Sequence, residues 1–303
     1  MTSPLPVTII GGYLGAGKTT LVNHLLRNAN GVRLAVLVNE FGELAIDEDL
    51  IEAEDDDIIS IAGGCVCCSF GSDLTGALMD MAKMTPPPDH LLIEASGVAI
   101  PSAIAGTVSL LDDYRMDGII ILADAETIEQ SARDKYMGDT VLRQLADANI
   151  VVLNKTDLVA DAKLTQTENW LDAQNRGVGL VRAIHGAVPS EILLDSYLAQ
   201  TTQSRPHHEA TNLEMMTLQT KHPRDIDAFA ESLASEQAGL IRAKGFAPSV
   251  SGDVKLIQVV GNRWNVTDAP DDKALGIVCL GFKGAISKTY LKSIEDENAE
   301  AGI

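Results

Sequence analysis

Positive charge is scarce in this 303-residue sequence, and long apolar runs are missing. Lys and Arg total 23 against 43 Asp and Glu, which gives a formal net charge of −20. Such a charge repels phosphate backbones and anionic lipid, so we expect neither nucleic acid nor membranes as partners. A membrane-spanning helix needs about 18 or more apolar residues in succession, and no run reaches that length. The first residues also lack the basic and apolar segments of a secretory signal, so we expect a cytoplasmic protein.

Cysteine is scarce as well, with four residues in the chain. Three of them, Cys65, Cys67 and Cys68, lie within four positions. In a reducing compartment such a cluster indicates metal binding or reactivity, not a disulfide framework. The remaining composition, 46% hydrophobic and 22% charged, is that of a folded protein. A chain of this length can form one large domain and a smaller one.

Short β-branched apolar runs alternate with stretches of helical spacing over the first two thirds of the chain. This alternation predicts βαβ units and an α/β fold whose sheet is mainly parallel. Leu21, Val22, Leu25 and Leu26 share one face of a helix that begins near Lys18, as expected for a helix covering a sheet. The predicted strands are Val7–Ile10, Leu34–Val38, Ile58–Ile61, Leu91–Ile93, Ile119–Ala123, Ile150–Leu153 and Leu180–Ile184.

The apolar pattern lapses at residues 201–212, which are rich in Thr, Gln, Ser, Pro and His. We therefore expect a large α/β domain over residues 1–200, a linker over 201–212 and a small α+β domain over 213–303. In the small domain, Pro223 is expected to open a helix that ends at Ala234. The predicted strands there are Glu214–Gln219, Lys255–Val260 and Gly276–Leu280.

The segment Gly12–Thr19 fits the pattern G-x-x-x-x-G-K-[ST] and lies between a predicted strand and a predicted helix. Glycines let backbone N–H groups surround phosphate oxygens, and the helix N-terminus adds positive potential. Lys18 can reach the β- and γ-phosphates, and Thr19 can bind Mg²⁺. A Rossmann dinucleotide site is the natural alternative, but the glycine spacing and Lys18-Thr19 disfavour it. The predicted nucleotide contacts are Gly12, Gly15, Ala16, Gly17, Lys18, Thr19 and Thr20.

The segment Asn154–Asp157 reads N-K-T-D and follows an apolar strand, so we expect it at the same edge of the sheet as the phosphate loop. The Asp157 carboxylate can accept hydrogen bonds from N1–H and the 2-amino group of guanine, which adenine does not offer. Asn154 can bond the base edge or hold neighbouring loops, and the aliphatic stem of Lys155 can lie over the base. The segment therefore predicts GTP as the nucleotide.

Two further loops follow apolar strands. Glu94 ends one strand, where P-loop proteins hold Mg²⁺ directly or through water, and the backbone N–H of Gly97 could sense the γ-phosphate. The loop Asn39–Glu43 follows another strand and could move with the nucleotide state. From this loop Glu40 could approach the cysteine cluster.

The segment Gly63–Cys68 follows the third predicted strand, which is expected to place three sulfurs near the nucleotide edge. Thiolates suit Zn²⁺, Cu(I) or Co²⁺, and three of them leave a tetrahedral ion one open position, which suits transfer. Redox chemistry and incidental burial are the alternatives. His207 and His208 are interpreted as ordinary linker residues, and Cys279 as a small apolar residue of a core strand.

Taken in order, the phosphate loop, the Asn39–Glu43 loop, the C-x-C-C, the E-x-x-G and the N-K-x-D resemble the CobW family of P-loop GTPases. The resemblance covers residues 7 to 200, and Leu240–Phe246 is similar to a segment of the family's C-terminal domain. It implies a GTP-hydrolysing metallochaperone that delivers zinc or cobalt to a client metalloprotein. On this resemblance, Lys18, Thr19 and Glu94 contact phosphate and Mg²⁺, Asn154 and Asp157 contact guanine, and Cys65, Cys67 and Cys68 hold the metal. We expect Lys18, Glu94 and Glu40 to take part in hydrolysis.

We hypothesise that GTP and Mg²⁺ order the Asn39 and Glu94 loops, which shifts the cysteine loop and changes its metal affinity until hydrolysis resets it. No arginine finger is evident, so intrinsic turnover is expected to be slow. Two alternatives stay open: a metal sensor or buffer that uses GTP only as a conformational ligand, and a P-loop kinase of a small molecule. The sequence identifies neither the client nor the oligomeric state, and a homodimer stays open.

Overall fold

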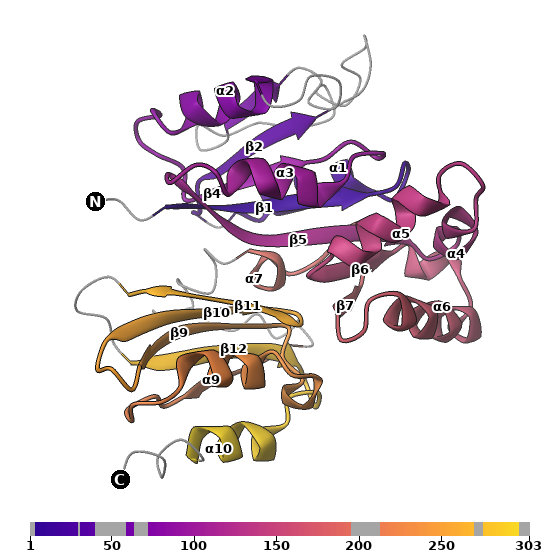
Figure 1. The fold of residues 1–303 in the computed structure, drawn as a ribbon. Coiled ribbons are helices and arrows are strands. Elements are labelled where there is room, and N and C mark those ends of the chain that lie inside the picture. The colour runs from indigo at the N-terminus through magenta and orange to yellow at the C-terminus, as the bar shows by residue number, and fades with distance from the viewer. Residues whose placement is uncertain are drawn as a thin grey trace. The chain divides into compact units, whose positions relative to one another are not determined.

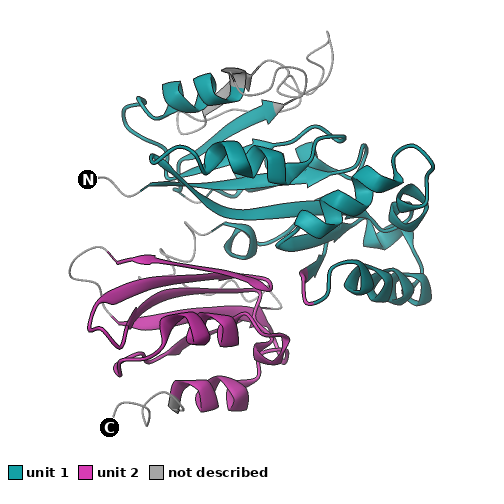
Figure 2. Ribbon diagram, in the orientation of Figure 1, with its two compact units in different colours: residues 1–176, 180–200 teal, residues 177–179, 201–303 magenta. Residues whose placement is uncertain are grey.

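The computed structural model describes residues 4–29, 31–39, 59–63, 72–194, 213–269 and 275–296. The chain separates into two compact units, residues 1–176 with 180–200 and residues 177–179 with 201–303 (Figure 2). Within the described residues, each unit has its own β-sheet, of seven strands in the first unit and five in the second.

The sheet of the first unit has the strand order β3-β2-β4-β1-β5-β6-β7 (Figure 1). Its strands are β1 (Leu5–Gly12), β2 (Leu34–Asn39), β3 (Ile59–Gly63), β4 (His90–Glu94), β5 (Tyr114–Asp124), β6 (Ile150–Asn154) and β7 (Gly179–Arg182). The pairs from β3 across to β6 are parallel. Because parallel strands end at one edge of a sheet, the loops that follow β1, β2, β3 and β4 all leave from that edge.

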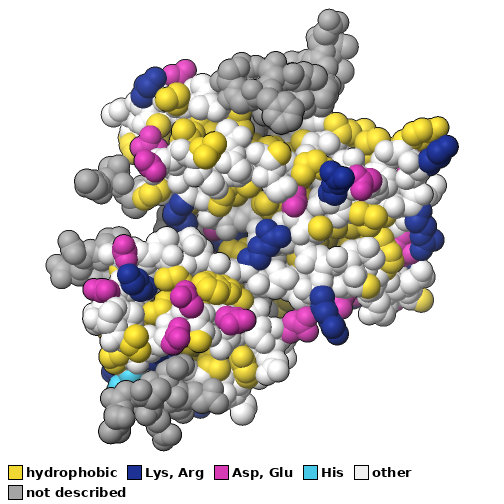
Figure 3. Space-filling view, in the orientation of Figure 1, with side chains coloured by type: hydrophobic (Ala, Val, Ile, Leu, Met, Phe, Trp, Pro, Cys, Tyr) yellow, Lys and Arg dark blue, Asp and Glu magenta, His cyan; other side chains and the backbone are white. Residues whose placement is uncertain are grey.

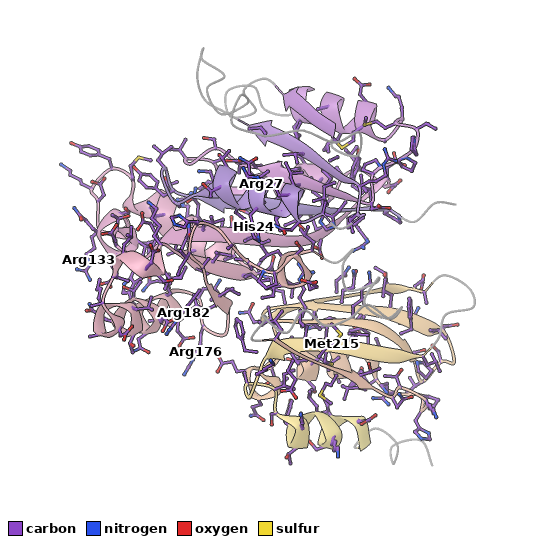
Figure 4. The ribbon with its side chains drawn as sticks, turned by 180° about the vertical axis from the view of Figure 1, so that it is seen from behind. His24, Arg27, Arg133, Arg176, Arg182 and Met215 are labelled. Atoms are coloured by element: carbon purple, nitrogen blue, oxygen red, sulfur yellow. The ribbon has the colours of Figure 1, made fainter. Side chains whose placement is uncertain are left out.

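Helices cover both faces of this sheet. They are α1 (Lys18–Arg27), α2 (Ser72–Met81), α3 (Pro101–Val108), α4 (Ile128–Ala132), α5 (Gly138–Asp147), α6 (Asp161–Gln174) and α7 (Ser190–Leu193). Helices α3 and α5 lie on the face toward the viewer in Figure 1. Helix α1, which carries His24 and Arg27, lies on the opposite face, in front in Figure 4. Its buried residues are the predicted set, Leu21, Val22, Leu25 and Leu26. The predicted α/β fold with a mainly parallel sheet is confirmed.

Two strands differ in extent from the prediction. β5 begins at Tyr114, well before the predicted Ile119, because the polar start of the strand pairs with the start of β1, where Leu5 lies opposite Tyr114. β7 ends at Arg182, before the predicted Ile184. The chain turns directly afterwards at His185, whose φ of 51° lies in the left-handed region and cannot continue a strand.

The second unit is an antiparallel sheet with the strand order β11-β10-β9-β12-β8, packed against helices. Its elements are β8 (Leu213–Leu218), α9 (Ile226–Leu233), β9 (Arg242–Pro248), β10 (Val254–Val260), β11 (Arg263–Asp268), β12 (Gly276–Phe282) and α10 (Lys288–Asp296). Phe229 and Leu233 of α9 and Leu291 of α10 share one core cluster with Ile257 and Ile277 of the sheet. This arrangement is the small α+β fold that the sequence predicts.

Cys279 lies in this core and is fully buried in β12. Burial, with the charge of Glu295 as a smaller contribution, raises the pKa of the Cys279 thiol to about 12. Burial raises it because the thiolate loses its solvation in an apolar environment. The thiol therefore stays protonated at neutral pH, which agrees with the prediction of a core residue.

The helix predicted from Pro223 begins later, at Ile226. Asp225 is its N-cap, and the Asp225 carboxylate accepts the backbone N–H of Ala228 at 3.1 Å. Because an aspartate in this position satisfies one of the free amides of the first turn, the helix starts after Asp225 and leaves Pro223 outside.

The surface carries charge of both signs. On the face shown in Figure 3, acidic, basic and apolar side chains are interspersed over both units. None of the helices in the described ranges is both long enough and apolar enough to cross a membrane.

Candidate nucleotide-binding site

The phosphate loop connects β1 to α1 in a tight turn that requires glycine. The φ angles are 134° at Gly12, 74° at Gly15 and 102° at Gly17, all in the region that side chains with a Cβ rarely adopt. A Cβ on Gly12 would also lie 2.4 Å from the carbonyl oxygen of Leu122 in β5. The loop therefore leads directly to the N-terminus of α1, where amide groups and the helix dipole favour an anion.

Thr19 and Glu94 meet at the end of this loop. The Thr19 hydroxyl donates a hydrogen bond of 2.8 Å to Oε1 of Glu94, although the two residues lie 75 positions apart. Glu94 is the last residue of β4 and is only 5% exposed. A hydroxyl and a carboxylate are the hard oxygen donors that Mg²⁺ prefers, so the pair fits a Mg²⁺ ion. Lys18 precedes Thr19 as the first residue of α1.

The segment after Glu94 packs against the phosphate loop. The backbone N–H of Ala95 donates to the carbonyl of Ile10 in β1 at 2.8 Å. A Cβ on Gly97 would lie 2.6 Å from Cδ2 of Leu14 and 3.0 Å from its backbone nitrogen. Gly97 is thus in direct contact with the phosphate loop, and a larger residue would push the two apart. Leu14 was not predicted as a site residue, because it occupies a variable position of the motif.

Asn154 ends β6 and joins two loops of the site. Its side chain is 2% exposed; Nδ2 donates to the carbonyl of Ala16 at 2.9 Å, and Oδ1 accepts the N–H of Gly186 at 3.0 Å. A Cβ on Gly17 would lie 2.5 Å from Nδ2. The side chain therefore holds the phosphate loop to the turn at Gly186, one of its two predicted roles, and contact with the base stays a prediction. No sequence motif marked the turn at Gly186.

Lys155 and Asp157 follow at the same edge. Lys155 has a φ of 60°, and its ammonium donates to Oδ2 of Asp124 at 2.6 Å. The hydroxyl of Thr156 donates to the carbonyl of Ala183 at 3.1 Å. Asp157 lies in the short 3-10 helix η2 (Thr156–Leu158), and its side chain is exposed. A left-handed residue held by an ion pair thus turns the chain so that the Asp157 carboxylate is open to a ligand.

Several predicted site residues lie outside the described residues, namely Glu40, Cys65, Cys67, Cys68, His207 and His208. The backbone that leads to the first four is described as far as Asn39 in β2 and Gly63 in β3, and these two residues are paired. Val38 of β2 lies opposite Glu94. Both loops therefore begin at the edge that carries Glu94. Within the described ranges, no three His, Cys, Asp or Glu side chains gather as a metal site.

A glycine-rich loop before a helix, a hydroxyl and carboxylate suited to Mg²⁺, and an N-K-x-D segment at one edge of a parallel sheet define a P-loop guanine-nucleotide-binding protein. The family model of the CobW/HypB/UreG nucleotide-binding domain matches residues 6–182. The chain belongs to this CobW/HypB/UreG family. With a phosphate loop and an N-K-x-D segment in place, it is a GTPase.

Curated relatives align over most of the chain. Zinc chaperone CobW of Sinorhizobium sp is 29% identical over an alignment of 306 positions, which covers 86% of each chain. Zinc chaperone YjiA of Escherichia coli (strain K12) is 30% identical over an alignment of 264 positions, which covers 80% of this chain and 81% of that protein. Zinc-regulated GTPase metalloprotein activator 1 of Dictyostelium discoideum is 30% identical over an alignment of 243 positions, which covers 67% of this chain and 50% of that protein.

Proposed function

We propose that this GTPase carries zinc as its cargo and delivers it to a client metalloprotein, with the nucleotide state setting how tightly the metal is held. The observation that carries the proposal is the shared edge, where Thr19 bonds Glu94 and the chain leaves β3 toward Cys65, Cys67 and Cys68. The names of the relatives, two zinc chaperones and a zinc-regulated GTPase, support zinc over cobalt. We assign the binding of GTP and of zinc to a domain over residues 1–200. Residues 201–212 are the linker to a C-terminal domain over residues 213–303.

In this account the triphosphate of GTP lies in the loop ahead of α1. Backbone amides of Gly15, Ala16 and Gly17 surround the phosphate oxygens, and Lys18 contacts the β- and γ-phosphates. Thr19 and Glu94 would hold Mg²⁺, and Glu40 would approach the cysteine cluster from the loop after β2. When bound, Mg²⁺ neutralises charge on the β- and γ-phosphate oxygens. The N–H of Gly97 faces the γ-phosphate and so distinguishes GTP from GDP.

The guanine base lies against the loop after β6. The exposed carboxylate of Asp157 accepts hydrogen bonds from N1–H and the 2-amino group, and the stem of Lys155 covers one face of the ring. Asn154 keeps this loop in register with the phosphate loop through its bond to Ala16. A site built for these two donors rejects adenine because the carboxylate would be left without them.

The cargo metal is held by the thiolates of Cys65, Cys67 and Cys68. Three sulfur ligands satisfy a tetrahedral zinc ion only in part, and the open fourth position lets a client ligand enter before the protein ligands leave. A fully closed four-ligand site would hold the ion too firmly for transfer. A metal carrier therefore needs a site in which the protein leaves one coordination position of the ion open.

The sheet order supports a coupling between the nucleotide site and the metal site. From β3 to β1 the strand ends present, in turn, the cysteine loop, the Glu40 loop, the Glu94 loop and the phosphate loop. Adjacent strands lie about 4.8 Å apart, so three spacings, roughly 14 Å, separate the first loop from the last. When the γ-phosphate orders the Glu94 and Glu40 loops, the cysteine loop is next in line and changes its metal affinity.

The metal part of the proposal is tested with a single thiol. Replacing Cys67→Ser should weaken zinc binding at least about tenfold, because a hydroxyl is a far poorer zinc ligand than a thiolate. The measurement is a competition titration against a chromophoric chelator with anaerobically purified protein. Cys279→Ala is the matched control, because this thiol is fully buried in the second unit, and it should bind zinc as the unmodified protein does. Equal zinc affinity in all three proteins would remove the cysteine cluster from the account.

A further inference from the structure

A residue of helix α5, Gln144, is hydrogen-bonded to the segment that follows Glu94. Nε2 of Gln144 donates to two carbonyls of that segment, Gly97 at 3.2 Å and Ala99 at 2.8 Å. The side chain of Gln144 is only 1% exposed. Its Oε1 accepts no hydrogen bond within the described part of the chain, so the two donated bonds alone set the orientation of the amide. One buried side chain thus fixes two peptide groups more than 40 positions away.

Asp147 holds the far end of the same segment. It lies one turn after Gln144 on α5, and its Oδ2 accepts the backbone N–H of Ser102 at 2.9 Å. Ser102 is in the first turn of α3, whose N-cap residue Ile100 provides no side-chain cap. Asp147 therefore caps α3 from a neighbouring helix. Between them, Gln144 and Asp147 restrain the chain from Gly97 to the start of α3.

Helix α5, which carries Gln144 and Asp147, is followed directly by β6, the strand whose last residue contacts the phosphate loop. After α5 the chain enters β6. All five residues of this strand are buried, and its last residue is Asn154. Asn154 in turn bonds the carbonyl of Ala16 in the phosphate loop. Helix α5 and strand β6 therefore contact both segments of the proposed phosphate site. Gln144 contacts Gly97, and Asn154 contacts Ala16 in the phosphate loop.

We propose that Gln144 is a positioning residue for GTP hydrolysis, which fixes the backbone of Gly97 so that its N–H is aimed at the γ-phosphate. The proposal rests on the γ-phosphate contact assigned above to Gly97. Glycine has more backbone freedom than any other residue, so an amide contributed by a glycine is preorganised only if its peptide groups are held from outside. Gln144 holds the Gly97 carbonyl, and Leu14 blocks movement toward the phosphate loop.

The decisive variant is Gln144→Met, which keeps the length and volume of the side chain but cannot donate to the two carbonyls. We expect kcat to fall about 10- to 100-fold, the range for a catalytic group displaced by a small distance. GDP affinity should change less than about threefold, because GDP lacks the γ-phosphate. The preference for a non-hydrolysable GTP analogue over GDP should therefore decrease, which a purely structural residue would not change.

Asn149→Ala is the matched control. Asn149 is a second buried amide on the same connection, but its Oδ1 accepts the N–H of Ile119 in β5 and does not contact the Gly97 segment. It should lower thermal stability while leaving kcat of the folded protein within about threefold. The proposal is wrong if Gln144→Met keeps both kcat and the preference for the GTP analogue over GDP. It is also wrong if the loss of kcat in Gln144→Met is no larger than the loss in Asn149→Ala.

Two further measurements complete the test. The first uses the unmodified protein and so does not depend on how Gln144→Met folds; the second examines the premise that Gly97 contacts the γ-phosphate. In the unmodified protein, the amides of residues 97–99 should exchange hydrogen more slowly with the GTP analogue than with GDP, and equal exchange would overturn the proposal. Gly97→Ala tests the premise, because the added methyl group meets Leu14. If that variant keeps the analogue preference, the assigned γ-phosphate contact fails and the role of Gln144 with it. If Gly97→Ala loses the preference and Gln144→Met keeps it, only the role of Gln144 is wrong.

Discussion

Replacing Asp157→Asn is expected to weaken GTP binding by about 10²- to 10³-fold and to create affinity for xanthosine triphosphate. On the proposed assignment the carboxylate would accept both N1–H and the 2-amino group of guanine, whereas an asparagine amide offers one acceptor and one donor. That pattern matches xanthine, which has a carbonyl in place of the 2-amino group. Sites that hydrogen-bond the polar edge of a substrate reach discrimination of this size. The measurement is a binding titration of both proteins with GTP, XTP and ATP.

The control for this exchange is Asp161→Asn, an exposed aspartate in the first turn of α6. It loses the same charge close by in sequence, yet it should leave the order of nucleotide affinities unchanged. An Asp157→Asn protein that still binds GTP as tightly as the unmodified chain would show that the base is recognised elsewhere.

The second large effect is expected at Glu94→Gln, which should lower kcat for GTP by about 10²- to 10³-fold at saturating GTP and Mg²⁺. Glutamine has the shape of glutamate and can still accept the 2.8 Å bond from Thr19, so the fold and the nucleotide pocket should persist. What is lost is the negative charge that, on the proposed assignment, would face Mg²⁺ and the γ-phosphate. The measurement is steady-state phosphate release across a range of Mg²⁺ concentrations.

Glu129→Gln provides the comparison, because Glu129 is a second buried carboxylate of the same unit. Its pKa is lowered, chiefly by the hydrogen bond from Lys163, which donates at 2.5 Å. Thr167 donates as well, at 3.1 Å, so the residue ties α4 to α6. This variant should be less stable but should retain kcat within about threefold once folded. If the two glutamine variants lose kcat equally, Glu94 has no special place in the reaction.

Much of the first unit could be predicted because its strands are continuous β-branched runs that are buried on both faces, a strong local signal. In the second unit β9 carries no such signal. Its core-facing residues include Ala243 and Gly245, and a Cβ on Gly245 would lie 1.9 Å from the carbonyl of Gly276. The strand is therefore defined by close approach to β12, and its first residue, Arg242, is charged yet only 1% exposed. β11 is largely polar and exposed, which is typical of an edge strand.

The motifs predicted which segments meet at the nucleotide edge, since a strand-loop-helix order and the rule for parallel sheets are sufficient for that. They did not predict the contacts that hold the segments together. Asn154 bonds Ala16 across 138 positions, and Gln144 bonds Gly97 across 47. Such bonds depend on the packing of whole elements, and a glutamine inside an amphipathic helix has no local pattern that distinguishes it from a surface residue.

The central claim is that the nucleotide state and the metal affinity are linked through one edge of the sheet. The most direct test measures the dissociation constant for zinc twice, with GDP bound and with a non-hydrolysable GTP analogue bound, in the presence of Mg²⁺. Coupled sites typically change each other's affinity by 5- to 150-fold, and we predict a difference of about tenfold or more. Equal zinc affinities in the two states would contradict the account.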